Sequence, residues 1–264
     1  MILFSWIGVF NNKCYNVVGE FMYKKINDIK INYELYGTGE DTIVFLHGWG
    51  QNIAMMKPIA DPLSKKHKVL ILDLPGFGTS EEPKTAITIY DYVYIIHKLI
   101  TELKLANITL VGHSFGGKLS LLYASKYNTD RLVILASPFD IEIKKMPLKT
   151  KIFKFIKKLP GMKKVAESLR NHIGSTDYKN ATPIMRDILT KHINTDITNE
   201  VKKIKCPTII IWGTNDEMVN VSKAYELKDL IKDSAVIIYP YCTHYAYLEN
   251  LDKTNRILES FTSN

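Results

Sequence analysis

Six short apolar runs, each ending in residues typical of turns, constrain the fold of this 264-residue chain more than any other feature. The runs are rich in β-branched residues, and strands that are apolar throughout are typical of a parallel sheet buried on both faces. Helical apolar spacing separates most of the runs, so we predict an α/β fold, a mostly parallel doubly wound sheet with helices on both faces. The runs are residues 42–46, 68–72, 108–111, 132–136, 208–212 and 235–239, and the helical patterns are residues 55–66, 90–103, 118–126 and 221–231.

The alternation of strands and helices fails only between Pro138 and Ile204. No buried strand is predicted there, and helical patterns occupy residues 152–159, 162–173, 181–193 and 195–203. Because the strand pattern resumes at Thr208, an insertion is favoured over a separate C-terminal domain. We therefore assign residues 22–137 and 205–264 to the core, and residues 138–204 to a helical cap inserted after the sixth strand.

The first 21 residues stand apart from this pattern. Residues 2–10 are apolar but too short to span a bilayer, and they lack the basic leader and cleavage site of a signal peptide. A strand pattern opens at Met22 and continues with Ile29, Ile31 and Tyr33 on alternate positions. We interpret residues 1–21 as an N-terminal extension, with a weak membrane-surface anchor as the alternative.

The net charge of +8 comes from the cap segment. Of 35 basic and 27 acidic side chains, 15 basic and 7 acidic lie between residues 138 and 204, and the rest of the chain is balanced. No nucleic-acid-binding module is evident, so we expect no nucleic-acid partner. The lysines crowding residues 144–164 suggest a membrane-facing lid as one hypothesis, but we favour an ordinary cap helix with its lysines in water.

The cysteines indicate neither a metal centre nor a redox motif. Cys14, Cys206 and Cys242 are widely spaced, and no C-x-x-C pair exists. We expect free thiols in a reducing, cytoplasmic compartment, and no metal or organic cofactor. Nothing in the sequence predicts an oligomeric state.

The segment Gly112-His113-Ser114-Phe115-Gly116 fits the G-x-S-x-G pattern of a nucleophile elbow. It follows a predicted buried strand and opens a helical pattern, which is the context this motif requires. The sharp turn lifts the Ser114 hydroxyl above the carboxyl end of the sheet and sets it at a helix N-terminus, where developing negative charge is favoured. We therefore predict Ser114 as a nucleophile.

A serine nucleophile needs a base, and the base needs an orienting acid. His244 follows the last predicted strand directly and is the predicted base. The side chain of His113 points away from that of its neighbour Ser114, so we interpret it as packing, and His47 as a brace for its own loop. Asp216, after residues 208–212, is the favoured acid, and Asp140, after residues 132–136, is its rival.

With these residues the sequence resembles the α/β-hydrolase superfamily over residues 23–264. The resemblance implies a Ser114–His244–Asp216 triad, a helical cap formed by the insertion, and an oxyanion hole made by the backbone N–H groups of Trp49 and Phe115. It rests on His47-Gly48-Trp49-Gly50, Asp73-Leu74-Pro75-Gly76-Phe77-Gly78-Thr79-Ser80, Gly112-His113-Ser114-Phe115-Gly116-Gly117, Gly213-Thr214-Asn215-Asp216 and Thr243-His244.

The resemblance implies a hydrolase acting on a small-molecule carboxylic ester of small to medium acyl length, through an acyl-enzyme intermediate. Serine at the elbow argues against haloalkane dehalogenases and epoxide hydrolases, which place Asp there. Carbon–carbon bond, thioester and peptidase-like amide hydrolysis stay open, and a non-catalytic binding protein is least favoured because no triad residue is missing. We expect the cap to set substrate choice, with Phe153, Tyr178, Met185 and Ile188 lining the acyl pocket.

Overall fold

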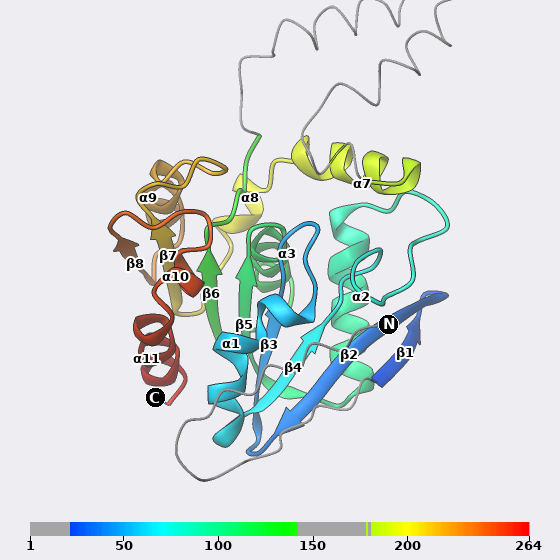
Figure 1. The fold of residues 1–264 in the computed structure, drawn as a ribbon, viewed down its shortest axis with the longest axis horizontal. Coiled ribbons are helices and arrows are strands. Elements are labelled where there is room, and N and C mark those ends of the chain that lie inside the picture. Colours follow the sequence, from blue (N-terminus) through cyan, green and yellow to red (C-terminus); the bar gives the residue numbers. More distant parts are fainter. Residues whose placement is uncertain (1–21, 142–177, 179–180, 264) are drawn as a thin grey trace, which may run out of the picture.

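The computed structural model describes residues 22–141, 178 and 181–263. They form an α/β fold in which an eight-stranded sheet, ordered β1-β2-β4-β3-β5-β6-β7-β8, carries helices on both faces (Figure 1). The predicted fold class is confirmed. The strands are β1 (Met22–Ile26), β2 (Ile29–Gly37), β3 (Asp41–Leu46), β4 (Lys68–Leu72), β5 (Ala106–His113), β6 (Arg131–Leu135), β7 (Thr208–Gly213) and β8 (Ser234–Tyr239).

The sheet begins with antiparallel strands and continues as a parallel array. Strand β1 pairs with β2 and β2 with β4 in antiparallel register, whereas β4, β3, β5, β6, β7 and β8 pair in parallel. The strand pattern predicted from Met22 is therefore a hairpin. Asn27 and Asp28 make its turn at φ 48° and 62°, the left-handed backbone that a two-residue hairpin turn requires.

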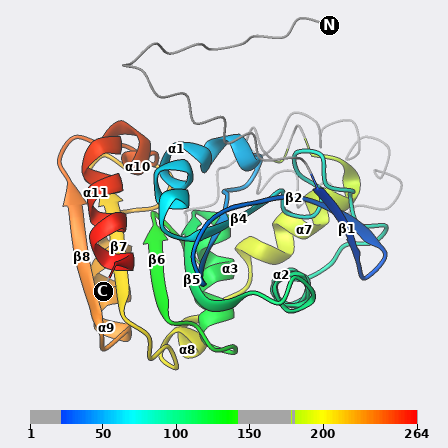
Figure 2. The same ribbon diagram turned by 90° about the horizontal axis from the view of Figure 1, so that it is seen from below.

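Both faces of the parallel strands are buried, which explains their continuous apolar sequences. Along β3, Val44 and Leu46 belong to one hydrophobic cluster, and Ile43 and Phe45 belong to the other. Seen from below, α10 and α11 lie on one side of the sheet and α2, α3 and α9 on the other (Figure 2). Side chains that alternate along a strand thus enter separate cores.

Helices α2, α3, α7 and α9 lie where helical patterns are predicted, whereas α8 covers only part of the pattern at residues 195–203, and no pattern predicts α10 or α11. The helical pattern at residues 55–66 is in fact broken, because Pro58 and Pro62 each start a new short turn and cannot donate to the turn before. Among the described residues, no helix is long and apolar enough to cross a membrane. The elements are η1 (Ile53–Met55), α1 (Lys57–Ala60), η2 (Asp61–Lys65), α2 (Ile89–Glu102), α3 (Phe115–Ala124), α7 (Pro183–Ile193), α8 (Thr198–Val201), α9 (Ser222–Leu230), α10 (Ala246–Glu249) and α11 (Leu251–Thr262).

Two helices belong to the segment predicted as the cap. Helix α7 starts at its cap residue Thr182, whose hydroxyl accepts from Met185 N, and α8 follows it closely. Helix α7 lies beyond the carboxyl ends of the strands (Figure 1). The helices predicted at residues 152–159 and 162–173 lie outside the described residues, as does the extension at residues 1–21.

Candidate active site

The carboxyl ends of the six parallel strands form one edge of the sheet, called the rim below, and Ser114 lies on it between β5 and α3. Ser114 has φ 51° and ψ −113°, a backbone conformation that side chains rarely adopt and that persists only where the surroundings enforce it. Ser114 N donates to Leu135 O at 2.9 Å, and Gly116 N donates to His47 O at 3.1 Å. A Cβ at Gly116 would collide with the carbonyls of Leu46 and His47, so only glycine allows this close approach.

Asp216 and His244 meet at the same rim, after β7 and β8. Asp216 Oδ2 lies 2.8 Å from His244 Nδ1, and both residues are buried, with 7% and 4% exposed. The other carboxylate oxygen, Oδ1, accepts from Met218 N and Val219 N at 2.9 Å each. A carboxylate held in this way accepts a hydrogen bond from the Nδ1–H of the imidazole and leaves Nε2 as an acceptor.

The rival acid Asp140 has a different partner. Its Oδ2 accepts from Lys223 Nζ at 2.6 Å, and Lys223 also pairs with Glu226 at 2.7 Å. The structure thus pairs Asp216 rather than Asp140 with His244.

Ser114 and His244 are linked through His113, the last residue of β5. His113 Nε2 lies 3.0 Å from the carbonyl oxygen of His244 and donates to it. Among the residues that the structure describes, the Ser114 hydroxyl forms no hydrogen bond with His244. Such contacts in unliganded sites are often long and tighten when a substrate binds.

His47 and His113 are both buried, and the sequence predicts His47 as a brace for its loop and His113 as packing. Burial lowers the pKa of His47 to about 4 and that of His113 to about 3. The Nδ1–H of His47 donates to Gly48 O at 2.7 Å, and its Nε2 accepts from Leu74 N at 3.0 Å. Neutral imidazole has one donor and one acceptor, so both nitrogens of His47 are satisfied by backbone, and the loop after β3 is tied to the loop after β4.

Two backbone N–H groups near Ser114 are left without an acceptor. Within the described part of the chain, neither Trp49 N nor Phe115 N donates a hydrogen bond. Phe115 is the first residue of α3, where an unpaired N–H and the helix dipole favour negative charge. The side chains of Trp49 and Phe115 contact each other edge to face, with ring centroids 5.3 Å apart.

A pocket of about 300 Å³ opens beside Trp49. Apart from Glu82, its described lining residues are uncharged, and Glu82 accepts a hydrogen bond from Thr182 Oγ1 at 2.8 Å. The loop after β4 supplies one wall, the start of α7 another. The described lining residues are Trp49, Gly50, Gly76, Phe77, Glu82, Ala181, Thr182 and Met185.

The residues predicted to line an acyl pocket lie in different places. Met185 lines the pocket beside Trp49. Ile188 is 1% exposed and packs into the core cluster on the α3 side of the sheet. Tyr178 lies against the guanidinium of Arg186, and its carbonyl accepts from Arg186 Nε at 2.8 Å. Phe153 lies outside the described residues.

Sequence reasoning missed two polar residues at the site. The imidazole of His192, in the last turn of α7, packs edge to face on Phe115 with ring centroids 4.5 Å apart. Lys118, in α3, is 1% exposed, and its Nζ donates to the carbonyls of His192 and Thr195 at 3.1 and 2.6 Å. Lys118 lies four residues after Ser114, and this spacing of about one helical turn could have indicated that it lies on the same face of α3 as the elbow.

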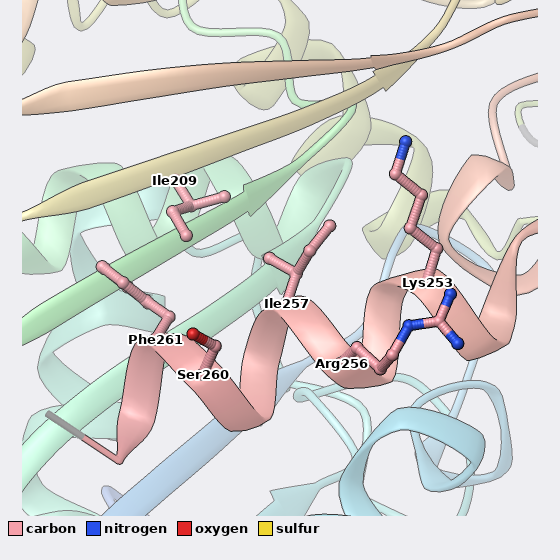
Figure 3. A pocket seen from close by; sticks show the side chains of 6 residues that line it. All are labelled: Ile209, Lys253, Arg256, Ile257, Ser260 and Phe261. Carbon is pink, nitrogen blue, oxygen red and sulfur yellow. The ribbon is translucent and has the colours of Figure 1, made fainter.

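Another pocket, of about 350 Å³, lies away from the rim (Figure 3). It is formed by Ile209, near the start of β7, and by side chains of α11 that include Arg256 and Phe261. Because Asp216 follows the end of β7, this pocket lies toward the opposite end of the strand.

Metal chemistry has no candidate centre in residues 22–141, 178 and 181–263. No group of three or more His, Cys, Asp or Glu side chains there is placed to hold a metal ion. In the same part of the chain, Cys206 and Cys242 are free thiols.

Comparison with known proteins agrees with this fold. A family model described as alpha/beta hydrolase fold matches residues 41–160. The chain is 25% identical over 261 residues to the 2-hydroxy-6-oxononadienedioate/2-hydroxy-6-oxononatrienedioate hydrolase of Escherichia coli K12, covering 88% of this chain and 91% of that protein. The family model and this relative thus confirm the resemblance to the α/β-hydrolase superfamily that the sequence indicates.

Solved structures of the same fold align along nearly the whole chain. The bromoperoxidase of Bacillus anthracis superposes with a TM-score of 0.74 at 24% identity, covering 93% of this chain and 100% of that one. The enol-lactonase of Burkholderia xenovorans LB400 superposes with a TM-score of 0.72 at 22% identity, covering 92% and 100%. At these identities the structures are similar in fold.

Proposed function

We propose that the chain is a serine hydrolase that cleaves a carboxylic ester of small to medium acyl length through an acyl-enzyme intermediate. The observation that carries this proposal is the 2.8 Å contact between Asp216 Oδ2 and His244 Nδ1 on the rim that also carries Ser114. A carboxylate that orients an imidazole next to an elbow serine is the arrangement that activates a hydroxyl as a nucleophile.

In the first half of the reaction, Ser114 Oγ attacks the carbonyl carbon of the ester and His244 Nε2 takes its proton. The tetrahedral intermediate collapses when His244 returns that proton to the departing alcohol oxygen, leaving the acyl group on Ser114. Asp216 holds the imidazole in the required tautomer and stabilises the imidazolium. In the second half, water replaces the alcohol, and the same proton transfers release the carboxylic acid.

The free N–H groups of Trp49 and Phe115 are our candidates for the oxyanion hole. A donor aimed at the developing oxyanion contributes about 3–4 kcal/mol to lowering the barrier. Phe115 N is at the start of α3, next to the nucleophile, so its position follows from the elbow itself. Trp49 N comes from the loop after β3, which His47 and Gln51 brace by hydrogen bonds to Gly48.

The size and lining of the pocket beside Trp49 favour a small or medium acyl group. Its volume of about 300 Å³ is at the lower end of the range of small-molecule sites. Trp49, Phe77 and Met185 give it an apolar wall, which suits an alkyl chain.

The test is hydrolysis of p-nitrophenyl acetate and butyrate by wild type, Ser114→Ala and Ser260→Ala. Ser260 is exposed on α11, so the same chemical change there is the matched control. We expect Ser114→Ala to lose ~10⁴-fold or more in kcat and the control to match wild type. Mass spectrometry of enzyme treated with a fluorophosphonate would find the adduct on Ser114; equal rates in wild type and Ser114→Ala would refute the proposal.

A carbon–carbon bond hydrolase is the second candidate, because the Escherichia coli relative is named as a hydrolase of 2-hydroxy-6-oxo-dienedioates. The same three side chains would serve that reaction. The substrate in that name carries two carboxylates, whereas Glu82 puts a carboxylate into the pocket of this chain. This charge is why we place the neutral ester first.

Assays of wild type with the two kinds of substrate distinguish the two candidate functions. Wild type is assayed with p-nitrophenyl butyrate and with a 2-hydroxy-6-oxo-dienoate ring-cleavage product, followed by loss of the dienol absorbance. We expect the ester to have the higher kcat/KM. A higher kcat/KM for the dienoate would put carbon–carbon cleavage first, and a panel with thioester and amide analogues would extend the ranking.

A further inference from the structure

His192 packs against the side chains of the two residues whose backbone N–H groups we propose as the oxyanion hole. Its ring lies edge to face on Phe115 at 4.5 Å and nearly parallel to Trp49, at 6.3 Å with 4° between the ring planes. The residue is 5% exposed. Met185, two turns earlier on α7, lines the pocket beside Trp49. One helix therefore carries both a pocket residue and an imidazole next to the proposed reacting centre.

Neither ring nitrogen of this imidazole has a hydrogen-bond partner among the residues that the structure describes. Its Nδ1 is buried without a hydrogen-bond partner, and in the described part of the chain Nε2 forms no hydrogen bond either. Burial, with the nearby Lys118 charge, lowers the pKa of His192 to about 3, so the ring is neutral and keeps one donor and one acceptor. Leaving such groups unpaired is unfavourable, and an apolar side chain would suit the surrounding aromatic rings better.

The backbone of His192 is nevertheless fixed to the core. Lys118 Nζ donates to the carbonyls of His192 and Thr195 at the end of α7. Lys118 belongs to α3, the helix that starts directly after Ser114. Lys118 lies one helical turn after the elbow, and its hydrogen bonds thus hold the backbone of His192 against α3.

We propose that His192 is a specificity-determining residue that hydrogen-bonds an oxygen substituent on the acyl group of the substrate. The proposal rests on the ester hydrolysis proposed above and narrows it to hydroxyacyl or ketoacyl esters. Because Nδ1 is buried, we assign the contact with the acyl group to the other ring nitrogen, Nε2. A plain alkyl acyl group leaves the imidazole unpaired, whereas a hydroxyl or keto oxygen two or three carbons from the ester pairs with it.

The experiment compares p-nitrophenyl butyrate with p-nitrophenyl 3-hydroxybutyrate, which share leaving group and chain length. Wild type is assayed beside His192→Leu, which removes the hydrogen bond, His192→Gln, which keeps a polar group, and His97→Leu. His97 lies on α2 against Tyr127 and is the matched histidine control. Thermal unfolding of each variant verifies that it is folded.

We expect wild type to prefer the hydroxy ester, and His192→Leu to lower the ratio of kcat/KM for the hydroxy ester to that for butyrate by about tenfold or more. His192→Gln should recover part of the preference, and His97→Leu should match wild type. Equal losses on both esters, or no preference in wild type, would overturn the role of His192. Ester turnover that persists in Ser114→Ala would instead overturn the proposed function, so the two failures are distinguishable.

Discussion

The rim around Asp216 and the end of α7 that faces it differ in how their polar groups are satisfied. Each oxygen of Asp216 has its partners, and His47 has a backbone partner on both ring nitrogens. His192, by contrast, has a buried nitrogen with none. Asp216 and His47 thus have partners without a substrate, whereas His192, like the backbone N–H groups of Trp49 and Phe115, has a polar atom with no partner among the described residues.

The same contrast holds for the charged groups. Lys118, which is buried beneath the end of α7, donates its hydrogen bonds to the backbone carbonyls of His192 and Thr195 rather than to a carboxylate. The two acids of the rim have different partners, because Asp216 pairs with His244 and Asp140 pairs with Lys223. Preorganised dipoles of this kind suit catalysis, and an underused polar wall suits selection among substrates.

Replacing Asp216 by its amide should reduce the activity of the rim more than any other change to its acids. We expect Asp216→Asn to lower kcat for p-nitrophenyl butyrate by ~10⁴-fold, because the amide cannot hold the Nδ1–H tautomer of His244. Asp140→Asn should stay within about threefold of wild type, because its partner is a lysine. Initial rates of folded variants test this, and a larger loss in Asp140→Asn would mean that the rival acid orients the base.

Lys118→Met should show how the buried ammonium beneath α7 makes the free energy of unfolding depend on pH. Burial lowers the pKa of Lys118 to about 8, against the attraction of Asp140 and Asp196. The folded state thus releases this proton at lower pH than the unfolded state, so between pH 8 and 10.5 the unfolded chain binds more protons and stability rises with pH. We expect the free energy of unfolding of wild type, minus that of the variant, to rise by about 1.4 kcal/mol per pH unit across that window.

The control for this experiment is Lys228→Met, a lysine that is exposed on α9. Urea unfolding at several pH values should give a curve parallel to that of wild type. A Lys118→Met curve that is also parallel to wild type would show that the buried ammonium contributes nothing to the pH dependence.

Most of the fold could be predicted because parallel strands buried on both faces leave uninterrupted apolar runs. The runs at residues 42–46 and 208–212 correspond to β3 and β7 within a residue at either end. The elbow could be found because strand, Ser114 and helix are contiguous. The candidate acids and base lie directly after strands, so parallel topology alone brings them to one edge.

What could not be predicted depends on contacts between distant residues or on local breaks in a pattern. Lys118 meets the carbonyl of His192 across 74 positions, and no periodicity indicates such a pair. The apolar spacing at residues 55–66 matches a helix, but Pro58 and Pro62 divide it. In the structure Asp140 pairs with Lys223 and Asp216 pairs with His244. Sequence spacing does not indicate that Lys223 lies next to Asp140.

The smallest expected change in kcat/KM comes from removing the negative charge in the pocket beside Trp49. It would show how the pocket wall selects substrates while the rim stays unaltered. Glu82 is the one charged side chain among the described lining residues. We expect Glu82→Gln to raise kcat/KM for p-nitrophenyl hemisuccinate, an anionic acyl ester, by about two- to fivefold at low salt, as partly exposed charge pairs allow. The rate with p-nitrophenyl butyrate should stay near wild type, because the rim is unaltered.

Added salt and a neighbouring acid provide the controls for Glu82. Ionic strength near 1 M shortens the screening length to ~3 Å, so the gain should shrink there if repulsion causes it. Glu81, the preceding residue, is exposed and accepts from Lys30 N at 3.1 Å. Glu81→Gln should change neither rate; an equal gain in that variant would assign the effect to the general charge of the surface, and a gain that persists in salt would assign it to the shape of the pocket.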